Sequence, residues 1–240
     1  MHASSQIASE TGLDRPVWTS LSTLHAGLSE GSALARRFAR NVNVFASARD
    51  DGADSLAALA ALVQPGERVY VLQVPDIVVP PGLVAAKEAR GVQMVATRAL
   101  HAEVAGDAGP EAIVPLGDAD APEMVALTRL TEPGPFLART HSMGRFVGIR
   151  IDGRLAAMAG ERMRFPGHTE VSGVCTHPDF RGRGLARRLS AAIAAGIQDR
   201  AEQPFLHAWQ TNEAAIALYR ELGFQVRAEV QVAVLERPAP

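Results

Sequence analysis

The sequence lacks most of the features that mark secreted and membrane-spanning proteins. Cys175 is the single cysteine of 240 residues, which excludes an internal disulfide and a zinc site built on several thiolates. No apolar run approaches the roughly 18–20 residues needed to cross a bilayer, and residues 1–16 carry no apolar signal core. We therefore expect a cytoplasmic protein with no membrane partner.

Concentrated positive charge is missing as well. The formal net charge is -2, Lys87 is the only lysine, and the arginines form no basic stripe, so we expect no nucleic-acid partner. Hydrophobic residues make up 47% and charged residues 21%, which is ordinary for a globular chain and argues against extensive disorder. The composition leaves a monomer and a homodimer open.

The first half of the chain has the pattern of alternating helices and strands. In chain order, the pattern predicts a helix within residues 18–40, a helix over 55–63, and strands over 68–74 and 92–96. The segment 101–111 is rich in alanine, glycine and aspartate and contains Pro110, which is typical of a linker. We therefore expect an N-terminal lobe over residues 1–110 and a second domain over 111–240.

The second half has more strand signals. The predicted strands cover residues 113–116, 146–149, 155–163, 169–176 and 205–209. Asp120 and Glu123 have capping-box spacing and predict the start of a helix, which TEPGPF over 131–136 ends. Asp152-Gly153 predicts a hairpin turn. The expected fold class is mixed α/β.

The most informative segment is VSGVCTHPDFRGRGLARR, residues 171–188. A strand ends before Pro178, and a helix begins inside the glycine-rich turn that follows. The first-turn N–H groups of such a helix lack intrahelical partners, and the macrodipole adds partial positive charge, so the turn can bind an anion. Arg187 stands where a dinucleotide fingerprint needs its third glycine, and no Walker A lysine follows. A plain tight turn with solvated arginines is the alternative interpretation.

Three positions of this turn resemble a known signature. Arg181-x-x-Gly184-x-Ala186 is similar to the R/Q-x-x-G-x-G/A motif of GNAT acetyltransferases, and GVCTHPDFRGRGLA resembles the subgroup that contains glycine N-acyltransferase-like proteins. The resemblance implies that the turn binds the pyrophosphate of coenzyme A and that the preceding strand end binds the pantetheine arm through its main chain. The residues that it implies for cofactor binding here are Val174, Cys175, Thr176, Arg181, Gly182, Arg183, Gly184, Leu185, Ala186 and Arg187.

A second signature follows at the expected distance. Asn212 is a candidate N-cap and Gly223 a candidate left-handed C-cap of one amphipathic helix, in which Tyr219 would simply pack. However, N-x-x-A-x-x-L-Y-x-x-L-G-F also resembles the second GNAT signature. That resemblance implies that Asn212 contacts the pantetheine and that Tyr219 is the general acid that protonates the departing thiolate.

The general base is open between two residues. Glu170 begins the strand before the turn, and the alternative is that it is a solvated strand end. His207 lies on the strand before Asn212, and the alternative is that it is a hydrogen-bonded core histidine. Glu161, Arg162 and Arg164 are expected to form a solvated strand face, although they could instead line the acceptor cleft.

Two further sites are disfavoured by the sequence. Cys175 lies in an apolar strand, where a cysteine is usually buried and inert, so we do not expect a covalent acyl-cysteine mechanism. His168, His177 and Asp179 have mixed spacing, and we assign no metal.

The resemblance also implies a fold and a reaction. It implies a twisted, mainly antiparallel sheet flanked by helices, in which two central strands splay apart around acyl-CoA, and a degenerate GNAT-like N-terminal lobe that contributes to the acceptor pocket or to packing. The expected reaction is direct transfer of an acetyl or short acyl group from acetyl-CoA to the primary amine of a small molecule or amino acid. The alternatives are a non-catalytic acyl-CoA sensor and a protein N-acetyltransferase, and an open, acidic acceptor groove would favour the latter.

Overall fold

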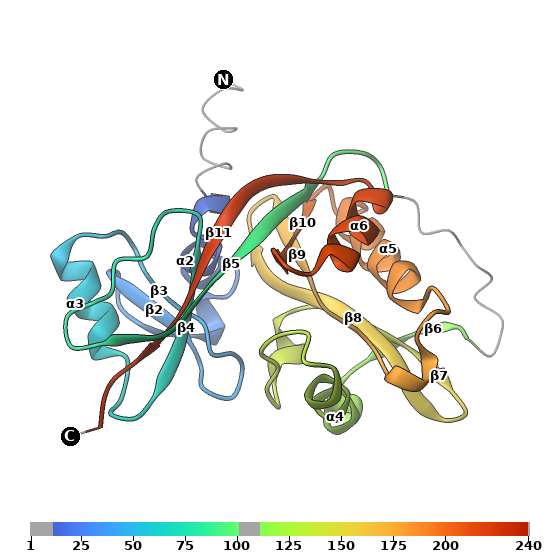
Figure 1. Ribbon diagram of the computed structural model, residues 1–240, viewed down its shortest axis with the longest axis horizontal. Coiled ribbons are helices and arrows are strands. Elements are labelled where there is room, and N and C mark those ends of the chain that lie inside the picture. The colour runs from blue at the N-terminus through green and yellow to red at the C-terminus, as the bar shows by residue number, and fades with distance from the viewer. Residues whose placement is uncertain (1–11, 101–110, 240) are drawn as a thin grey trace.

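The computed structural model describes residues 12–100 and 111–239. Eight strands form one twisted sheet in the order β4-β11-β5-β10-β9-β8-β7-β6 (Figure 1). Within it, β10 and β9 run parallel and all other neighbouring strands run antiparallel. The bounds in sheet order are β4 (Arg68–Gln73), β11 (Phe224–Glu236), β5 (Val84–Ala96), β10 (Gln203–Trp209), β9 (His168–Thr176), β8 (Arg154–Phe165), β7 (Phe146–Ile151) and β6 (Ile113–Leu116).

Helices cover the sheet, and a small second sheet completes the N-terminal part. The helices are α2 (Pro16–Ser22), α3 (Ala53–Ala61), α4 (Ala121–Thr131), α5 (Leu185–Gln198) and α6 (Glu213–Leu222), and the second sheet is β1 (Ser29–Gly31), β2 (Ala35–Phe38) and β3 (Ala46–Ala48). Single 3-10 turns lie at Ala26–Leu28, Asp118–Asp120, Thr140–Met143 and Pro178–Phe180. No helix in the described part of the chain is long and apolar enough to span a membrane. The mixed α/β fold and its mainly antiparallel sheet are as predicted.

Strands β9 and β10 separate in the middle of the sheet. They pair only where residues 203–205 meet 168–170, and beyond that point neither strand is bonded to the other. Gly173 lies in the left-handed region with φ of 63°. The register between β9 and β8 shifts beside it, between Met158 and Gly160, which marks a β-bulge. The bulge bends β9 away from β10 and opens a gap between the two strands.

The first half of the chain contributes strands to the same sheet. β5 pairs with β10 and with β11, and β4 forms the far edge against β11. Figure 1 shows β11 running from the side of α6 to the side of α3, so the last residues of β11 lie beside β4. The linker predicted over 101–111 lies almost wholly outside the described residues.

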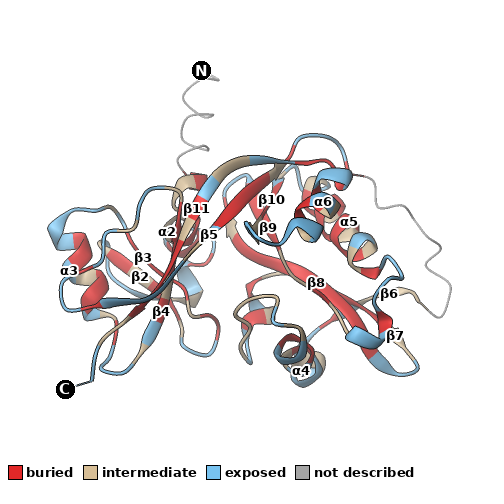
Figure 2. Ribbon diagram, in the orientation of Figure 1, coloured by how far each residue is buried: buried red, intermediate tan, exposed pale blue. Residues whose placement is uncertain are grey.

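The apolar face of α5 anchors the C-terminal half. Leu185, Leu189, Ile193 and Ile197 recur every four residues and are all buried against β8 and β9. Burial of each such side chain is worth about 1.5–3 kcal/mol, so this helix holds its N-terminus firmly in place. Figure 2 shows the buried residues gathered on the sheet and on the inner faces of its helices.

The prediction of a helix within 18–40 is wrong. α2 ends at Ser22, and the strands β1 and β2 lie within the remainder. Leu24 is 52% exposed, so the regularly spaced leucines do not form one buried face of a helix. Gly31, with φ of 126°, turns the chain between β1 and β2, where a helix is impossible.

Two other local predictions need correction. The strand expected over 92–96 is only the end of β5, whose earlier residues are mostly exposed and are held by pairing with β11. Asp120 precedes α4 as predicted, but its side chain does not cap that helix; instead it accepts a hydrogen bond from the N–H of Gly117 and pairs with Arg150.

Candidate active site

The glycine-rich turn borders a cavity, which we call the turn cavity. Gly182 and Gly184 have φ of 78° and 72°, a conformation that glycine adopts without strain, and Gly184 is the N-cap of α5. The N–H groups of the first turn of α5 therefore remain available to a ligand. The cavity is lined by residues 131–133, 174–176, 180–187, 209, 212, 214, 215, 218 and 219.

All residues that the sequence predicted for cofactor binding lie around the turn cavity. They are Val174, Cys175, Thr176, Arg181, Gly182, Arg183, Gly184, Leu185, Ala186, Arg187, Asn212 and Tyr219. Asn212 is the N-cap of α6, because its Oδ1 accepts from the N–H of Ala215 at 3.2 Å. Arg183 pairs with Glu111, a contact that the sequence did not indicate.

A second cavity, the lobe cavity, lies on the other side of the gap. It is lined by Phe45, Tyr70, Leu72, Gly91, Pro133, Gly134, Pro135, Arg162, Val171, Ser172, Gly173, Val174, His207, Ala208, Trp209, Asn212, Ala215, Tyr219, Val230 and Val232. Its walls come from Phe45, from strands β4, β5, β8, β9, β10 and β11, from α6, and from the loop that follows α4. The two cavities meet at Pro133, Val174, Trp209, Asn212, Ala215 and Tyr219.

Tyr219 lies where the cavities meet and is only 8% exposed. Burial raises the pKa of its hydroxyl to about 12, although the neighbouring Ser190 opposes the change. The phenol therefore keeps its proton at any physiological pH, as a proton donor must. Its ring packs edge-to-face on Phe224, with centroids 6.0 Å apart, so α6 and β11 together fix its position.

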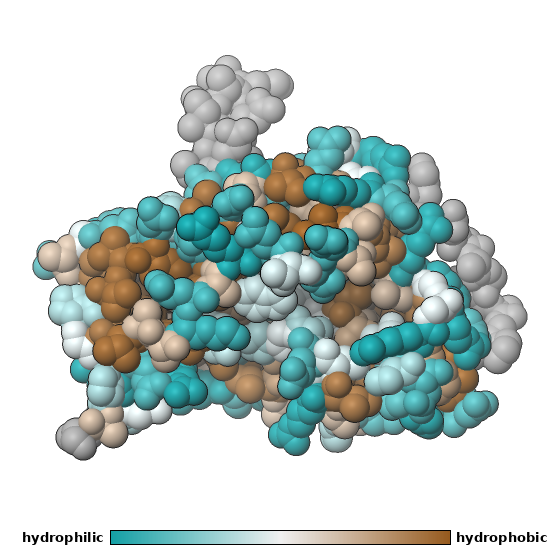
Figure 3. Space-filling model, in the orientation of Figure 1, coloured by the Kyte–Doolittle hydropathy of each residue, from teal (hydrophilic) through white to brown (hydrophobic). Residues whose placement is uncertain are grey.

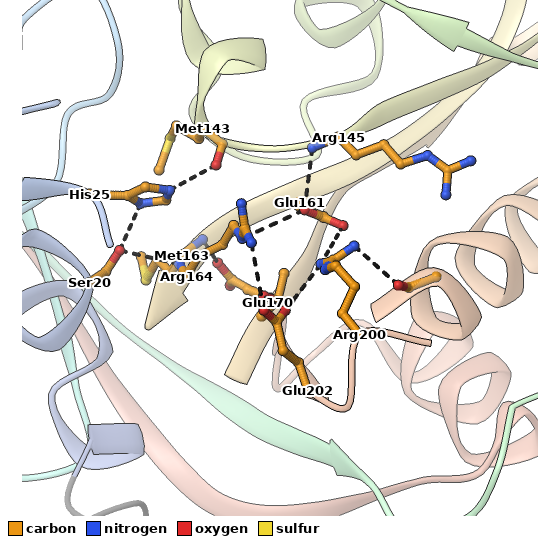
Figure 4. A network of polar contacts seen from close by, with 12 residues as sticks. Ser20, His25, Met143, Arg145, Glu161, Met163, Arg164, Glu170, Arg200 and Glu202 are labelled. Atoms are coloured by element: carbon orange, nitrogen blue, oxygen red, sulfur yellow. Dashed lines mark hydrogen bonds and ion pairs between the residues drawn. The ribbon is translucent and has the colours of Figure 1, made fainter. Parts of the chain in front are cut away.

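Glu170 is fully buried, so the interpretation of a solvated strand end is wrong. Arg162 binds it with two hydrogen bonds, from Nε at 2.7 Å and from Nη2 at 2.6 Å. The N–H of Met163 also donates to it at 3.2 Å (Figure 4). Burial alone would raise the pKa of Glu170, but Arg162 and His207 outweigh burial and lower the pKa below its usual range. The side chain is therefore a carboxylate that accepts protons poorly.

His207 is oriented by a chain of hydrogen bonds. Its Nδ1 lies 2.7 Å from Oε1 of Glu170, and its Nε2 lies 3.1 Å from Nε2 of Gln93. Gln93 donates from that same nitrogen to the carbonyl of Leu13, while its Oε1 accepts from Arg227. The amide nitrogen is thus the end that faces His207. Nδ1 of His207 therefore faces an acceptor, the carboxylate of Glu170, and Nε2 faces a donor, the amide of Gln93.

The predicted solvated face on β8 is also wrong. Glu161 and Arg162 are 2% and 9% exposed, and Glu161 binds Arg200 at 2.9 Å (Figure 4). Arg164 is partly exposed, and its N–H donates to Ser20, whose hydroxyl in turn binds His25. His25 also binds the carbonyl of Met143, and burial lowers its pKa to about 4. This network therefore joins α2 to the C-terminal half instead of facing water.

Cys175 has the character of a structural residue. Its side chain is buried, and burial raises the pKa of the thiol to about 11, so little thiolate exists at neutral pH. His168, which was considered as a metal ligand, packs parallel to the ring of Phe165 in the core. Within residues 12–100 and 111–239, no three histidine, cysteine or acidic side chains are grouped so that they could hold a metal ion.

Sequence reasoning missed the residues that close the lobe cavity and orient His207. Phe45, Tyr70 and Gln93 belong to the first half of the chain, where no motif marks them. The one available signal was the alternation in RVYVLQ over β4, which predicts that Tyr70 and Leu72 share a face. Their contact with the site depends on β11, which brings the lobe against the C-terminal half.

Comparisons with known proteins agree with this geometry. The family model described as FR47-like protein matches residues 146–233. A crystal structure from Novosphingobium aromaticivorans, assigned to the GNAT family of acetyltransferases, is 42% identical and superposes with a TM-score of 0.86 over 95% of this chain and 99% of that one. A GCN5-related N-acetyltransferase from Kribbella flavida shares the fold at 17% identity, with a TM-score of 0.60 over 100% of this chain and 97% of its own.

A curated relative matches a shorter part of the chain. The N-alpha-acetyltransferase RimI of Mycobacterium tuberculosis is 36% identical over 92 residues, which are 37% of this chain. The match spans 56% of the length of RimI. Because the similarity to the Novosphingobium protein extends over nearly the whole of both chains, this protein belongs to the GNAT family and is an acyltransferase.

Proposed function

We propose that the protein moves an acetyl or other short acyl group from acyl-CoA in the turn cavity directly to a primary amine in the lobe cavity. The observation that carries this proposal is the meeting of the two cavities at Tyr219, across the gap between β9 and β10. A thioester that reaches through the gap would present its carbonyl to the lobe cavity. A co-substrate made inside the cell also favours a cytoplasmic location.

The turn cavity suits the long, charged part of acyl-CoA. A diphosphate at the N-terminus of α5 would accept hydrogen bonds from the main chain of 184–187 and interact favourably with the helix dipole. Neither Gly182 nor Gly184 carries a side chain that would keep a phosphate from the main chain. The unpaired half of β9, residues 171–176, has free main-chain groups toward the gap, and these suit the amides of the pantetheine arm.

The chemistry requires two proton transfers. The neutral amine nitrogen attacks the thioester carbonyl carbon and forms the C–N bond, and the C–S bond then breaks with its electron pair on sulfur. We assign protonation of that thiolate to Tyr219, whose raised pKa keeps the phenol protonated until the thiolate forms. The proton lost from the amine passes to a base, directly or through water.

For that base we favour His207 over Glu170. His207 lines the lobe cavity and Glu170 lines neither cavity, and both oxygens of Glu170 are already bound by Arg162. When Nε2 of His207 accepts a proton, its hydrogen bond from Gln93 must break, while the bond from Nδ1 to Glu170 strengthens. Glu170 would then stabilise the imidazolium without taking the proton itself.

The acceptor that we propose is a small molecule or amino acid, as in glycine N-acyltransferase-like proteins. Phe45, Tyr70 and Leu72 of the N-terminal lobe wall the lobe cavity, so a chain of residues has less room there than a compact amine. We propose that the role of the N-terminal lobe is to close one side of the lobe cavity. We also propose that the lobe is a degenerate GNAT-like unit, since β4 and β5 continue the sheet of the C-terminal half.

A protein N-terminus is the second candidate acceptor. It is favoured by the match to RimI, which is named as an N-alpha-acetyltransferase and is 36% identical over 92 residues. Against it, the described residues that line the lobe cavity include no aspartate or glutamate, so the cavity is not the acidic groove that would favour a protein acceptor.

Release of free thiol from acetyl-CoA tests the proposal. Purified full-length protein would be incubated with acetyl-CoA and, in parallel, with small amines, free amino acids and short peptides with unblocked N-termini, and products would be identified by mass spectrometry. Acylation of small amines or amino acids supports the proposal, and acylation of peptides alone favours the second candidate. Tight binding of coenzyme A by calorimetry, without thiol release for any amine, would contradict transfer and favour an acyl-CoA sensor.

A further inference from the structure

We infer that the acceptor is a monoamine with an uncharged aromatic or aliphatic body, and that the N-terminal lobe selects it. This inference rests on the proposed function, because it concerns the occupant of the lobe cavity. It goes further by naming which amines fit and which do not.

The wall of the lobe cavity that faces the gap is apolar. Phe45 and Tyr70 meet edge-to-face with centroids 5.9 Å apart and an interplanar angle of 73°. Tyr70 and Leu72 alternate along β4, and Val230 and Val232 alternate along β11, so each pair lies on one face of the sheet. β4 and β11 are hydrogen-bonded neighbours, and the two pairs therefore form one continuous surface. Such a surface gains free energy from burying hydrocarbon or an aromatic ring.

Proline and aromatic residues continue this wall at the mouth of the gap. Pro133 and Pro135, in the loop after α4, line the cavity opposite the lobe. Trp209 is 40% exposed and lines both cavities, so its ring is available to a ligand on either side. Figure 3 shows hydrophilic and hydrophobic residues interspersed over the outer surface on this face.

The one charged side chain among the described lining residues is already neutralised. Arg162 binds Glu170 behind it with two hydrogen bonds and lies over the ring of Phe45, 5.0 Å from its centroid. Glu170 is fully buried beneath this pair and does not line the cavity. Of the remaining described lining residues, only Tyr70, His207 and Tyr219 carry titratable side chains, and both ring nitrogens of His207 already have partners in Glu170 and Gln93.

These charges decide which amines the cavity accepts. A second ammonium group, as in a diamine or in lysine, would lose its hydration and find no carboxylate among the described lining residues to pair with, so its burial is unfavourable. The reacting amine is favoured for the same reason, because an apolar environment disfavours its ammonium form and so supplies the neutral nucleophile. A monoamine with a ring or branched chain gains binding free energy by burying its hydrocarbon against the wall, and only one ammonium group must lose its proton.

Two pairs of amines test the inference, one that differs by a charge and one that differs in the polarity of the body. The kcat/KM for acetyl-CoA consumption would be measured for pentylamine against 1,5-diaminopentane, and for phenethylamine against 2-aminoethanol. We expect each first member to exceed its partner by at least about tenfold, because a buried charge or unpaired polar group costs more than 1.4 kcal/mol. A wild-type enzyme that uses the diamine as well as or better than pentylamine would overturn the inference.

A designed carboxylate sharpens the test. Tyr70→Glu places an anion in the half-buried wall and should shift the ratio of the two kcat/KM values toward 1,5-diaminopentane by about tenfold or more. Val84→Glu makes the same addition on β5 at a position that is 47% exposed and lines neither cavity, and it should leave the ratio unchanged. Circular dichroism and thermal melting would confirm that both variants are folded.

Each outcome has one meaning. A shift in folded Tyr70→Glu that is absent from Val84→Glu supports the inference, and equal shifts in both, or none in either, count against it. If Tyr70→Glu does not fold, the wild-type pairs alone decide. Absence of thiol release with every amine would instead refute the proposed function, whereas use of amines without preference for the uncharged body would refute only this inference.

Discussion

The two cavities that meet at Tyr219 are built in opposite ways. Most of the turn cavity comes from one continuous stretch, residues 174–187, and it offers main-chain N–H groups at glycines with positive φ. The lobe cavity is made mainly of side chains from β4, β9, β10, β11 and α6, with Gly91 of β5, and these elements lie far apart in the sequence. One site is therefore set by local backbone conformation and the other by tertiary packing.

This difference has a functional consequence. A site made of main-chain groups tolerates most changes of side chain but no change of backbone conformation, which suits a co-substrate that does not vary. A site made of side chains changes with each substitution, which suits the recognition of a particular acceptor. The predictions below test each side of this comparison, from the largest expected effect to the smallest.

Replacement of Tyr219 by phenylalanine should separate chemistry from binding. We expect kcat to fall by about 10²–10⁴-fold, because a positioned general acid contributes that much, while affinity for coenzyme A stays near the wild-type value. Because the pKa of Tyr219 is about 12, the wild-type rate should show no loss from this group up to about pH 10. Thiol release and calorimetry on the same preparations measure both quantities. A kcat within threefold of wild type would remove Tyr219 from the mechanism.

Glu170→Gln should show how much the buried ion pair with Arg162, beside the lobe cavity, contributes to the free energy of unfolding. The change leaves the Arg162 guanidinium buried without its counter-charge, and breaking such a pair typically costs about 3–5 kcal/mol in the free energy of unfolding. The matched control is Glu229→Gln, whose ion pair with Arg90 has a nitrogen–oxygen distance of 3.9 Å and is more than half exposed on both sides, so little change is expected. Urea denaturation compares the two. Equal stabilities would mean that the buried pair contributes nothing.

The same carboxylate gives a pH dependence of known sign. The pKa of Glu170 is lower in the folded than in the unfolded protein. Its contribution to the free energy of unfolding is therefore complete above about pH 4.3, the pKa of a glutamate in the unfolded chain, and is lost as the pH falls further. Glu170→Gln should therefore flatten the acid limb of the stability curve below that pH. An acid limb of unchanged slope in the variant would show that Glu170 titrates normally in the fold.

His25, which binds Ser20 and the carbonyl of Met143, should make the stability of the protein depend on pH. Its pKa of about 4 lies below the ordinary value of 6.5, so the unfolded chain takes up the proton first as the pH falls. Stability should then decrease between about pH 6.5 and pH 4, by roughly 3 kcal/mol for this group if 1.36 kcal/mol is lost per unit.

The variant His25→Gln should lose that part of the pH dependence. Urea denaturation at pH 7 and pH 4.5 would give the difference for both proteins, and the comparison cancels the other histidines, including His168, whose pKa burial also lowers. A variant with the same decrease as wild type would show that His25 does not carry it. Activity at pH 7 separates this stability effect from any effect on the cavity itself.

Prediction from sequence succeeded where the information was local. Asn212 as N-cap, Gly223 as left-handed C-cap and the turn at Asp152-Gly153 are each determined by a few adjacent residues, and the structure confirms all three. The helix start at Gly184 belongs to the same class. In each position the backbone conformation or a side-chain acceptor follows from the residue type.

Prediction failed where a long-range contact overrides the local pattern. Arg162 and Glu161 have the composition of a solvated strand, and only their partners Glu170 and Arg200 allow them to be buried. Gln93 acquires its role through Leu13, 80 residues away. Such pairings leave no periodic signal, because each depends on which strand lies beside which in the finished sheet.

The smallest expected effect compares two glycines with the same backbone conformation. Gly184 and Gly66 have φ of 72° and 74°, and an added Cβ would meet no atom within 4 Å at either position. Alanine at each should therefore impose a similar strain of about 1–3 kcal/mol, measurable as a loss of thermal stability. Only Gly184 borders the turn cavity, so only Gly184→Ala should weaken binding of coenzyme A, by about 10-fold, as the first turn of α5 shifts to relieve the strain. Calorimetry with coenzyme A on both variants measures this difference. Equal affinities in the two variants would show that the backbone at the turn does not hold the ligand, and the contrast between a main-chain site and a side-chain site would then no longer hold.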